Sequence, residues 1–522
     1  MNKLVISFAC AFALGLPLAA TAQTIEEAVA AIEKREFKSA IATLSKLAEA
    51  GNPKGQLMLG LMYLDGVGME RDTKLALGWI RKAAEQGSGE AQYHLATLHE
   101  RGIGQPKDAQ QAAAWYRKAA EQGLAAAQLK TGLIFAEGEG VAKDPVQAAA
   151  WLAKAAAQGN GDAQAYLGTM HERGTGVAKS FDEAVRLYRQ SADQNLAVGQ
   201  YNLALMYMAG TGVPKDPVQA VNLLRKAAEQ GVANAQYNLG VMYQQGRGVA
   251  RDEQQAVSWY RKAADQGLAN AQHNLGAMYQ FGDGGLAKDA QQAVGWYRKG
   301  AEQGYALSQY HLGRAYDAGS GVAKDVGQAL LWYRKAADQG LALAQRTLGI
   351  MSMKGEGAPA DPQRAVAWFR KAADQGDAAG QGLLGKMYED GIGVAKDEEQ
   401  AATWYRRAAD QGYGPAFAAL GGKYATGRGV RQDFDQAFIW FQKGADQGHA
   451  SAQFKLGLMY ALGKGIPKNA EVAFYWWLLA SAQGDELAIK QLPTVEAGLD
   501  LRQRAAVKAR VAAWKPRNPD LR

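Results

Sequence analysis

Histidine, serine and acidic residues are the side chains of this sequence that could carry catalysis or bind a metal, and their spacing fits neither role. His94 and His99 are not at the i and i+4 positions of the H-E-x-x-H zinc motif. No serine is followed at i+3 by lysine, the spacing of serine β-lactamases. No glycine-rich connector reads G-x-x-x-x-G-K-[ST], the phosphate-binding loop. The sequence therefore predicts a protein that is not an enzyme, with no catalytic residue, metal site or cofactor.

The acidic residues and histidines that recur at fixed positions have a structural interpretation. Aspartates such as Asp72 and Asp252 come just before an apolar-periodic stretch. A single carboxylate in each connector is fewer than the oxygens that calcium takes, whereas an aspartate at this place can cap the free N–H groups of a helix. His99 and His171 occupy the position that is Tyr243 in a later repeat. We interpret them as core residues rather than as metal ligands.

The elements that carry these residues are copies of one unit of about 36 residues. The stretch AQYNLGVMYQQGRGVARDEQQAVSWYRKAADQG at 235–267 recurs along the chain, and its closing Gly267 has counterparts from Gly51 to Gly484. These positions enclose twelve units, of which the unit 268–304 is one residue longer than the others. A constant period at this length is typical of a solenoid.

Each unit predicts two helices joined by a glycine-rich connector. Ala235, Leu239 and Met242 have the i, i+4, i+7 spacing of one helical face. Gly246 can end this helix in the left-handed conformation, and Asp252 can cap the next one. Neither helix can bury its apolar face alone, so the units must stack on one another. We predict an all-α fold, a right-handed α/α superhelix of twelve helix-turn-helix repeats over residues 52–484.

The second helix of each unit and the two chain ends complete the predicted core. Trp259 has a tryptophan counterpart in nine of the other eleven units, so this position is predicted to be buried. Residues 23–51 align with the second half of a repeat and are predicted to form an N-terminal capping helix. Residues 485–522 are predicted to form C-terminal capping helices, the first of which ends near Pro493.

The first residues, MNKLVISFACAFALGLPLAATAQ, predict export. Lys3, the apolar run that follows it and the A-x-A sequence ending at Ala22 fit a signal peptide of residues 1–22, cleaved after Ala22. Cys10 is the only cysteine, so the mature chain can form no disulfide. No other stretch is long and apolar enough to span a bilayer. We predict a periplasmic protein, with secretion as the alternative.

The formal net charge is +8, and much of the basic charge of the second helices comes from an Arg-Lys pair that is followed three residues later by an acid. Such a pattern is typical of a solvated outer face. The sequence therefore predicts no nucleic-acid partner.

The pattern A-Q-x-x-L-G-x-M-Y-x-x-G-x-G-V…D…A-x-x-W-Y-R-K-A-A-x-Q-G resembles the Sel-1-like repeat family, relatives of the tetratricopeptide repeats. The resemblance implies an α/α superhelix that acts as an adaptor in macromolecular assembly and signalling. Exported bacterial members resemble periplasmic regulators, exopolysaccharide-assembly scaffolds and host-interaction factors. The family carries no catalytic residues that could be transferred to this chain.

The variable positions of the first helix predict a binding surface. Tyr237, Val241 and Gln244 lie on the face opposite the apolar stripe, which lines the concave surface in tetratricopeptide arrays. Exposed aromatic residues beside an arginine are typical of protein interfaces. The predicted partner-binding residues are Tyr201, Tyr237, Gln244, His273, Gln280, Tyr310, Arg314 and Arg346. The sequence A-Q-Y-N-L-G is also the common sequence of the family, so the alternative is that these residues are inherited from the family and have no binding role.

Two functions remain compatible with the sequence. The favoured one is a periplasmic or secreted scaffold that binds partner proteins on its concave face, in envelope assembly, signalling regulation or host interaction. The alternative is a solenoid that binds glycan or peptidoglycan by stacking the same aromatic residues on sugar rings.

Overall fold

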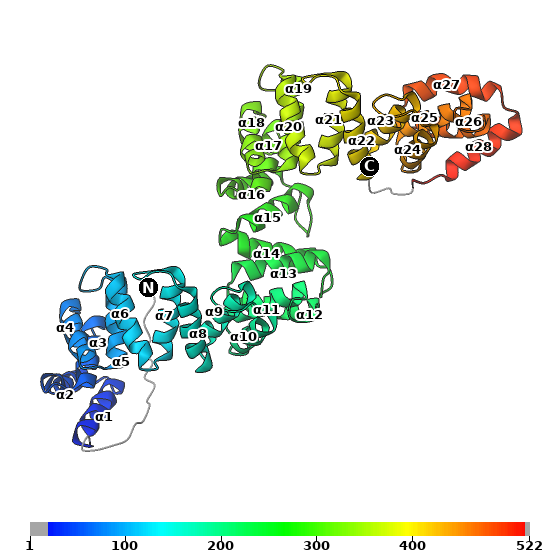
Figure 1. Cartoon of the computed structure of the whole chain (residues 1–522). Helices are drawn as coiled ribbons and strands as arrows, with labels where there is room; N and C mark the ends of the chain where they lie inside the picture. Colours follow the sequence, from blue (N-terminus) through cyan, green and yellow to red (C-terminus); the bar gives the residue numbers. More distant parts are fainter. Residues whose placement is uncertain (1–18, 517–522) are drawn as a thin grey trace. The chain divides into compact units, whose positions relative to one another are not determined.

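The computed structural model describes residues 19–516, which form 28 helices and no strand. This confirms the predicted all-α solenoid. The chain divides into two compact units within α14 (Glu253–Asp265): unit 1 ends at Trp259 and unit 2 begins at Tyr260 (Figure 1). Residues 1–18 of the predicted signal peptide lie outside the described residues. Among the helices of residues 19–516, none combines the length and the apolar character that crossing a bilayer requires.

Twelve pairs of helices make up the repeats. The first helices are α3 (Pro53–Asp65), α5 (Gly89–Arg101), α7 (Ala125–Glu137), α9 (Gly161–Arg173), α11 (Ala197–Ala209), α13 (Ala233–Gln245), α15 (Ala269–Phe281), α17 (Ala306–Ala318), α19 (Ala342–Lys354), α21 (Ala378–Asp390), α23 (Gly414–Thr426) and α25 (Ala450–Leu462). The second helices are α4 (Thr73–Glu85), α6 (Ala109–Glu121), α8 (Pro145–Ala157), α10 (Phe181–Asp193), α12 (Pro217–Glu229), α14, α16 (Ala290–Glu302), α18 (Val326–Asp338), α20 (Pro362–Asp374), α22 (Glu398–Asp410), α24 (Phe434–Asp446) and α26 (Ala470–Ser481).

The predicted capping residues start every second helix. In α4, Asp72 accepts hydrogen bonds from the backbone N–H groups of Lys74 and Leu75, each at 2.9 Å. Ser180 and Asn469 make the same kind of contact where they replace aspartate. Because the N–H groups of the first helical turn have no partner within the helix, these caps set where each second helix begins.

Each repeat buries its core between its two helices, and a glycine in the first helix lets them approach closely. A Cβ atom added at Gly313 of α17 would lie 2.8 Å from the ring of Tyr333 in α18. Tyr333 is 1% exposed, so this tyrosine position is the most deeply buried aromatic site of the second helix. The neighbouring tryptophan position is buried in some repeats and half-buried in others. Trp259 is 9% exposed and Trp440 5% exposed, whereas Trp296 is half-buried, with Lys299 Nζ 3.8 Å from its ring centroid.

Buried glutamines link successive repeats, a role that the sequence analysis did not assign. Gln345 Nε2 donates to the carbonyl oxygen of Ala337 in the preceding repeat at 3.1 Å. Its Oε1 atom accepts a hydrogen bond from Gln375 Nε2 at 2.7 Å. Equivalent pairs recur along both units, for example Gln86 with Gln56 at 2.7 Å. The two glutamines of the A-Q and Q-G sequences therefore satisfy buried polar groups where repeats meet.

The N-terminal end contains two helices where one was predicted. They are α1 (Ala19–Glu33) and α2 (Phe37–Glu49), separated by a turn in which Arg35 has φ 61°. Ile25 of α1 and Leu44 of α2 belong to the same buried cluster. A single straight helix would have carried Ile25 beyond the repeats, whereas the turn folds its apolar face back onto α2 and α3.

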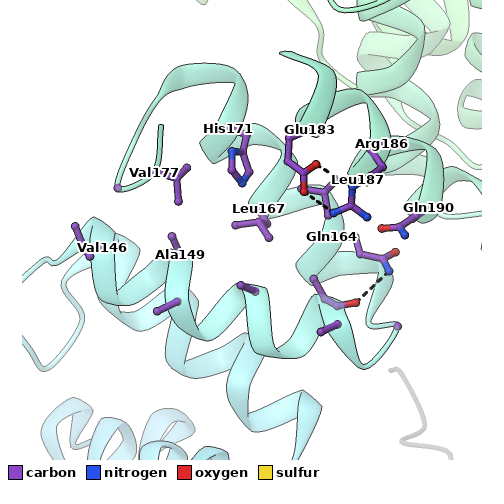
Figure 2. A pocket seen from close by; sticks show the side chains of 16 residues that line it. Val146, Ala149, Gln164, Leu167, His171, Val177, Glu183, Arg186, Leu187 and Gln190 are labelled. Atoms are coloured by element: carbon purple, nitrogen blue, oxygen red, sulfur yellow. Dashed lines mark hydrogen bonds and ion pairs between the residues drawn. The ribbon is translucent and has the colours of Figure 1, made fainter. Parts of the chain in front are cut away.

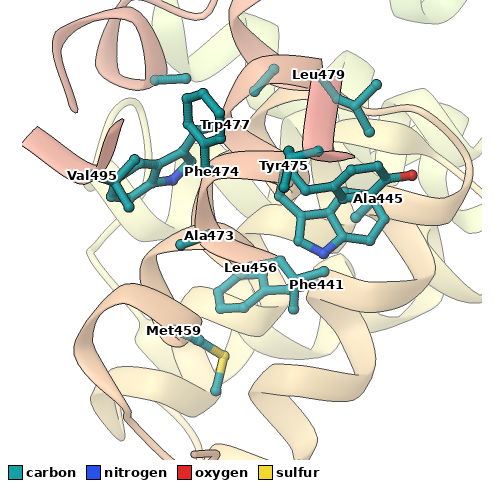
Figure 3. Close-up of a cluster of buried hydrophobic side chains, with 14 of the residues drawn as sticks. Phe441, Ala445, Leu456, Met459, Ala473, Phe474, Tyr475, Trp477, Leu479 and Val495 are labelled. Atoms are coloured by element: carbon teal, nitrogen blue, oxygen red, sulfur yellow. The ribbon is translucent and has the colours of Figure 1, made fainter. Parts of the chain in front are cut away.

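The C-terminal end is covered by α27 (Glu486–Ala497) and α28 (Leu501–Ala513). The helix predicted to end near Pro493 continues past it to Ala497, because Val495 packs in the terminal core. Figure 3 shows Val495 beside the aromatic residues of α26, among them Phe474 and Trp477. These side chains would otherwise face solvent at the open end of the solenoid.

Candidate functional site

In unit 1, the predicted binding residues lie half-buried on α11 and α13. Asn238 Nδ2 of α13 donates to the phenol oxygen of Tyr201 at 3.5 Å, so the two first helices place these side chains side by side. Burial raises the pKa of Tyr201 above its ordinary value. Tyr237 and Gln244 are also half-buried on α13. Part of each predicted side chain is therefore already used in packing.

In unit 2, His273 is buried and not part of an exposed aromatic row. Its side chain is 9% exposed, and its ring centroid lies 5.1 Å from that of His311 and 5.5 Å from that of Tyr305. Tyr305 and His311 belong to the next repeat and cover the imidazole. Burial lowers the pKa of His273 and of His311 to about 4, with a smaller effect of His311 on His273 and of Arg314 on His311.

The other predicted residues of unit 2 differ in their accessibility. Gln280 Oε1 accepts a hydrogen bond from the buried Tyr297 hydroxyl at 2.7 Å. Tyr310 is half-buried, with its ring centroid 5.6 Å from that of Tyr333. Arg314, next to them on α17, is exposed.

Arg346 is held by an ion pair between repeats. Its Nη1 atom lies 3.2 Å from each carboxylate oxygen of Asp377, and the two side chains are 24% and 13% exposed. Asp377 Oδ1 also accepts the backbone N–H of Gly380 at the start of α21. The Asp377 carboxylate therefore both caps α21 and binds Arg346. Arg346 is held in place by this contact between repeats, and only part of its guanidinium is accessible to a partner.

A hollow that the sequence analysis did not single out lies on the first-helix surface of unit 2. It has a volume of about 450 Å³ and is formed by α21, α22, α23 and α25. At the position of Tyr237, α21 has Gly382 and α23 has Ala418. The missing rings leave the space open. Tyr413 closes one side of it, because a Cβ atom at Gly382 would lie 2.4 Å from Tyr413 Cε1. We call this space the basic hollow.

Basic side chains line this hollow. Lys386, Arg428 and Lys455 are among its lining residues. Lys386 Nζ lies 2.9 Å from Asp390 Oδ2, with 63% of the lysine side chain exposed. Within residues 19–516, neither Arg428 nor Lys455 forms an ion pair. The rim therefore carries two cations that no carboxylate of the described chain neutralises by direct contact.

The floor of the basic hollow is a buried ionic network around Lys423. This lysine occupies the core position of Met242 and is 2% exposed. Its Nζ atom lies 2.6 Å from Glu389 Oε1 and also forms an ion pair with Glu398. Tyr405 donates its hydroxyl to Glu389 Oε2 at 2.7 Å. The hydrogen bond from Lys423 lowers the pKa of Glu398, and burial raises that of Tyr405. A charge removed from water requires such partners.

The repeat that contains Lys423 also breaks the glutamine linkage. Phe417 stands where other repeats have the buried glutamine, and it is 2% exposed. Its ring stacks on His449 with centroids 5.8 Å apart. Gln447 corresponds to Gln411, whose Nε2 donates to the buried Gln381 of the same repeat, and the Oε1 atom of Gln447 is buried without a hydrogen bond. Phe417 and Lys423 were visible as departures from the repeat pattern, and an alignment of the units by their core positions would have indicated this repeat.

A second depression lies in unit 1, between the second helices α8 and α10 (Figure 2). Its volume is about 740 Å³. Leu187 occupies the tryptophan position of α10, and Ala153 and Ala157 of α8 replace the longer polar residues of other repeats. Figure 2 shows Glu183 and Arg186 paired at one edge, with Glu183 Oε2 2.9 Å from Arg186 Nε. Across residues 19–516, no group of three or more His, Cys, Asp or Glu side chains is placed to hold a metal ion.

Comparison with known proteins identifies the repeat. The Sel1 repeat family matches residues 53–88, 89–124, 125–160, 161–196, 197–232, 233–268, 269–305, 306–341, 342–377, 378–413, 418–449 and 450–485. These twelve matches confirm the predicted repeats, and the match that begins late, at residue 418, omits the segment containing Phe417. The comparison with curated proteins gave no match.

Solved structures extend this similarity. One is the crystal structure of c5321, described as a protective antigen present in uropathogenic Escherichia coli strains displaying an SLR fold. It is 34% identical, the alignment covers 90% of this chain and 93% of that one, and the TM-score is 0.68. A Sel1 repeat protein from Oxalobacter formigenes is 34% identical over 47% of this chain and 96% of its own, with a TM-score of 0.44. Immunity protein Pa5087 from Pseudomonas aeruginosa is 23% identical over 42% and 83%, with a TM-score of 0.30. The chain belongs to the Sel1 repeat family.

Proposed function

We propose that this protein is a non-catalytic scaffold that binds partner proteins on the surface formed by its first helices. Sel1 repeat solenoids generally serve as protein-interaction scaffolds. The observation that carries the proposal is the contrast between constant core positions and the variable position of Tyr237, which becomes Arg346, Gly382 and Ala418 in later repeats. Packing requires the constant residues, whereas the variable ones give successive repeats different surface chemistry.

We further propose that the scaffold acts outside the cytoplasm, in the periplasm or after secretion. The support is the signal-peptide pattern of residues 1–22 and the absence of cysteine from residue 11 onward. The similar protein c5321 is described as a protective antigen, which fits a protein that meets the environment of the cell. Envelope assembly, signalling regulation and host interaction are the processes that such a scaffold would serve.

Protein partners are favoured over glycan. Stacking on sugar rings requires a row of accessible aromatic faces. His273 is buried, and Tyr201, Tyr237 and Tyr310 are half-buried. Partly buried tyrosines beside polar groups suit a protein interface, where hot-spot residues sit in well-packed surroundings.

The test is site-specific photo-crosslinking in the cells that produce the protein. A photoreactive residue replaces Arg314 or Lys386 on the first-helix surface, with matched controls at Gln291 and Gln363, which are exposed on second helices. We expect defined protein adducts from the first-helix positions and none from the controls. Adducts of equal yield from both surfaces, or binding to purified cell-wall sacculi in place of protein adducts, would contradict the proposal.

A further inference from the structure

We infer that the basic hollow binds an acidic peptide segment of the protein partner, through carboxylates that reach Lys455, Arg428 and Lys386. This inference rests on the proposed scaffold function and names the chemistry of one of its docking sites.

The hollow has the size of a ligand site. Its volume of about 450 Å³ falls within the range of about 300–1,000 Å³ that is typical of binding pockets. The space exists because Gly382 and Ala418 replace the larger residues of this position in other repeats, such as Tyr237 and Tyr310. The hollow therefore results from the small residues Gly382 and Ala418 at the surface position of Tyr237. The leucine and glycine that pack in the core of other first helices are kept in α21 and α23.

The charges of the lining select an anion. Lys386, Arg428 and Lys455 line the hollow together with a single carboxylate, Glu389. Both oxygens of Glu389 already bind protein groups, Oε1 the ammonium of Lys423 and Oε2 the hydroxyl of Tyr405. Lys386 also contacts Asp390, whereas Arg428 and Lys455 form no ion pair within residues 19–516, so these two cations are left to bind an added carboxylate. Charge-assisted hydrogen bonds from lysine and arginine to carboxylates are among the strongest that proteins form.

The floor favours a peptide over a simple anion. Leu383, Tyr413 and Pro415 also line the hollow, so apolar side chains next to the carboxylates have a surface to contact. The ionic network around Lys423 and the ring of Phe417 hold α23 in place beneath this surface. A site whose floor is fixed before binding loses little freedom when the ligand arrives.

The test measures binding of a labelled peptide with alternating glutamate and leucine to the purified full chain by fluorescence anisotropy, with a glutamine-for-glutamate peptide as the reference. Lys455→Glu reverses one rim charge, and Lys464→Glu makes the same change at an exposed lysine outside the hollow. We expect Lys455→Glu to weaken binding by about tenfold or more, and Lys464→Glu by less than about twofold. We also expect weaker binding when salt rises from about 20 to about 150 mM.

A steric variant tests the hollow without changing charge. A Cβ atom at Gly422 would meet only Lys455 Nζ, at 3.9 Å, so Gly422→Leu fits the helix and fills the space. Gly295→Leu is the control, because a Cβ atom there meets nothing within 4 Å on exposed α16. Both changes favour helix formation, so folding is retained. We expect Gly422→Leu alone to reduce peptide binding.

The outcomes separate this inference from the proposed function. An equal loss of peptide affinity in Lys455→Glu and Lys464→Glu, or full peptide binding by Gly422→Leu, would show that the hollow is not the binding site. Tighter Lys455-dependent binding of polygalacturonate than of the peptide overturns the peptide as the occupant. If the acidic peptide does not bind while the photoreactive residue in place of Arg314 still crosslinks to a partner, the inference about the hollow is wrong and the proposed scaffold function is retained. If the peptide binds in the hollow and no partner crosslinks from any first-helix position, the binding site is supported and the proposed scaffold function is contradicted.

Discussion

Lys423 Nζ lies 2.6 Å from Glu389 Oε1 at a position where most repeats bury a methionine. The lysine is 2% exposed, and the glutamate is 34% exposed at the floor of the basic hollow. An ionic contact has therefore replaced an apolar one in the core of a single repeat. Because a buried charge is stable only with its partners, the pair makes the local fold depend on polar residues that also border a surface site.

The first prediction concerns this pair. Lys423→Met restores the usual core residue but removes the cation that Glu389 and Glu398 bind. We expect a loss of about 1–3 kcal/mol in the free energy of unfolding of unit 2, below the value for fully buried pairs because both glutamates are partly exposed. Denaturant unfolding followed by tryptophan fluorescence measures it.

The matched control adds Glu389→Gln to Lys423→Met. The glutamine keeps an oxygen that can accept from Tyr405 and carries no charge, so we expect the double variant to recover most of the lost stability. A double variant less stable than Lys423→Met would show that the hydrogen bond from Tyr405 needs the carboxylate and that the charge balance is secondary.

The second prediction concerns pH and the buried imidazole of His273, which contacts the half-buried imidazole of His311. The pKa of His273 is lowered from 6.5 to about 4 by burial, so the folded state keeps this ring neutral. Above pH 6.5 the ring is neutral in both states and the fold has its full stability. Between pH 6.5 and about 4 the unfolded chain takes up the proton and the folded chain does not, so stability falls as pH falls.

For His273 alone this effect amounts to at most about 3 kcal/mol. Hydrogen–deuterium exchange of α15 and α17, corrected for the intrinsic pH dependence of exchange, reports the loss where it occurs. His273→Phe removes the titrating group and keeps a ring of similar size against Tyr297 and Tyr305. We expect this variant to lose less protection on acidification. An unchanged pH dependence would assign the effect to other groups, beginning with His311.

The third prediction concerns the depression between α8 and α10. Leu187→Trp restores the residue that ten other repeats have at this position and extends into open space that already exists. The larger side chain removes more apolar surface from water, so we expect unit 1 to gain about 1 kcal/mol.

Thermal and denaturant midpoints of the full chain measure this gain. Trp151→Leu is the companion variant, since Trp151 is 8% exposed and its truncation should lower both midpoints. A lower midpoint for Leu187→Trp would mean that the walls of the depression do not accommodate an indole. The depression would then not be explained by leucine in place of tryptophan.

Much of the fold was determined by the sequence alone. The period placed the twelve repeats, and the recurring capping residue placed the start of each second helix, as Asp72 and Ser180 illustrate. Both features depend on contacts within one repeat or between neighbours, which have a fixed spacing in the chain. The close approach at glycines such as Gly313 was likewise predictable, because only packing explains a recurring glycine inside a helix.

Tertiary structure decided the accessibility of the candidate residues. His273 and Tyr237 hold the same position in the sequence pattern, yet His273 is buried because Tyr305 and His311 of the following repeat cover it. The period specifies which residues share a face, but the size of the neighbouring side chains decides whether that face is open. The same reason explains the basic hollow. Gly382 and Ala418 leave space on the surface, and only the tertiary structure places Tyr413 and the lysines of adjacent helices around that space.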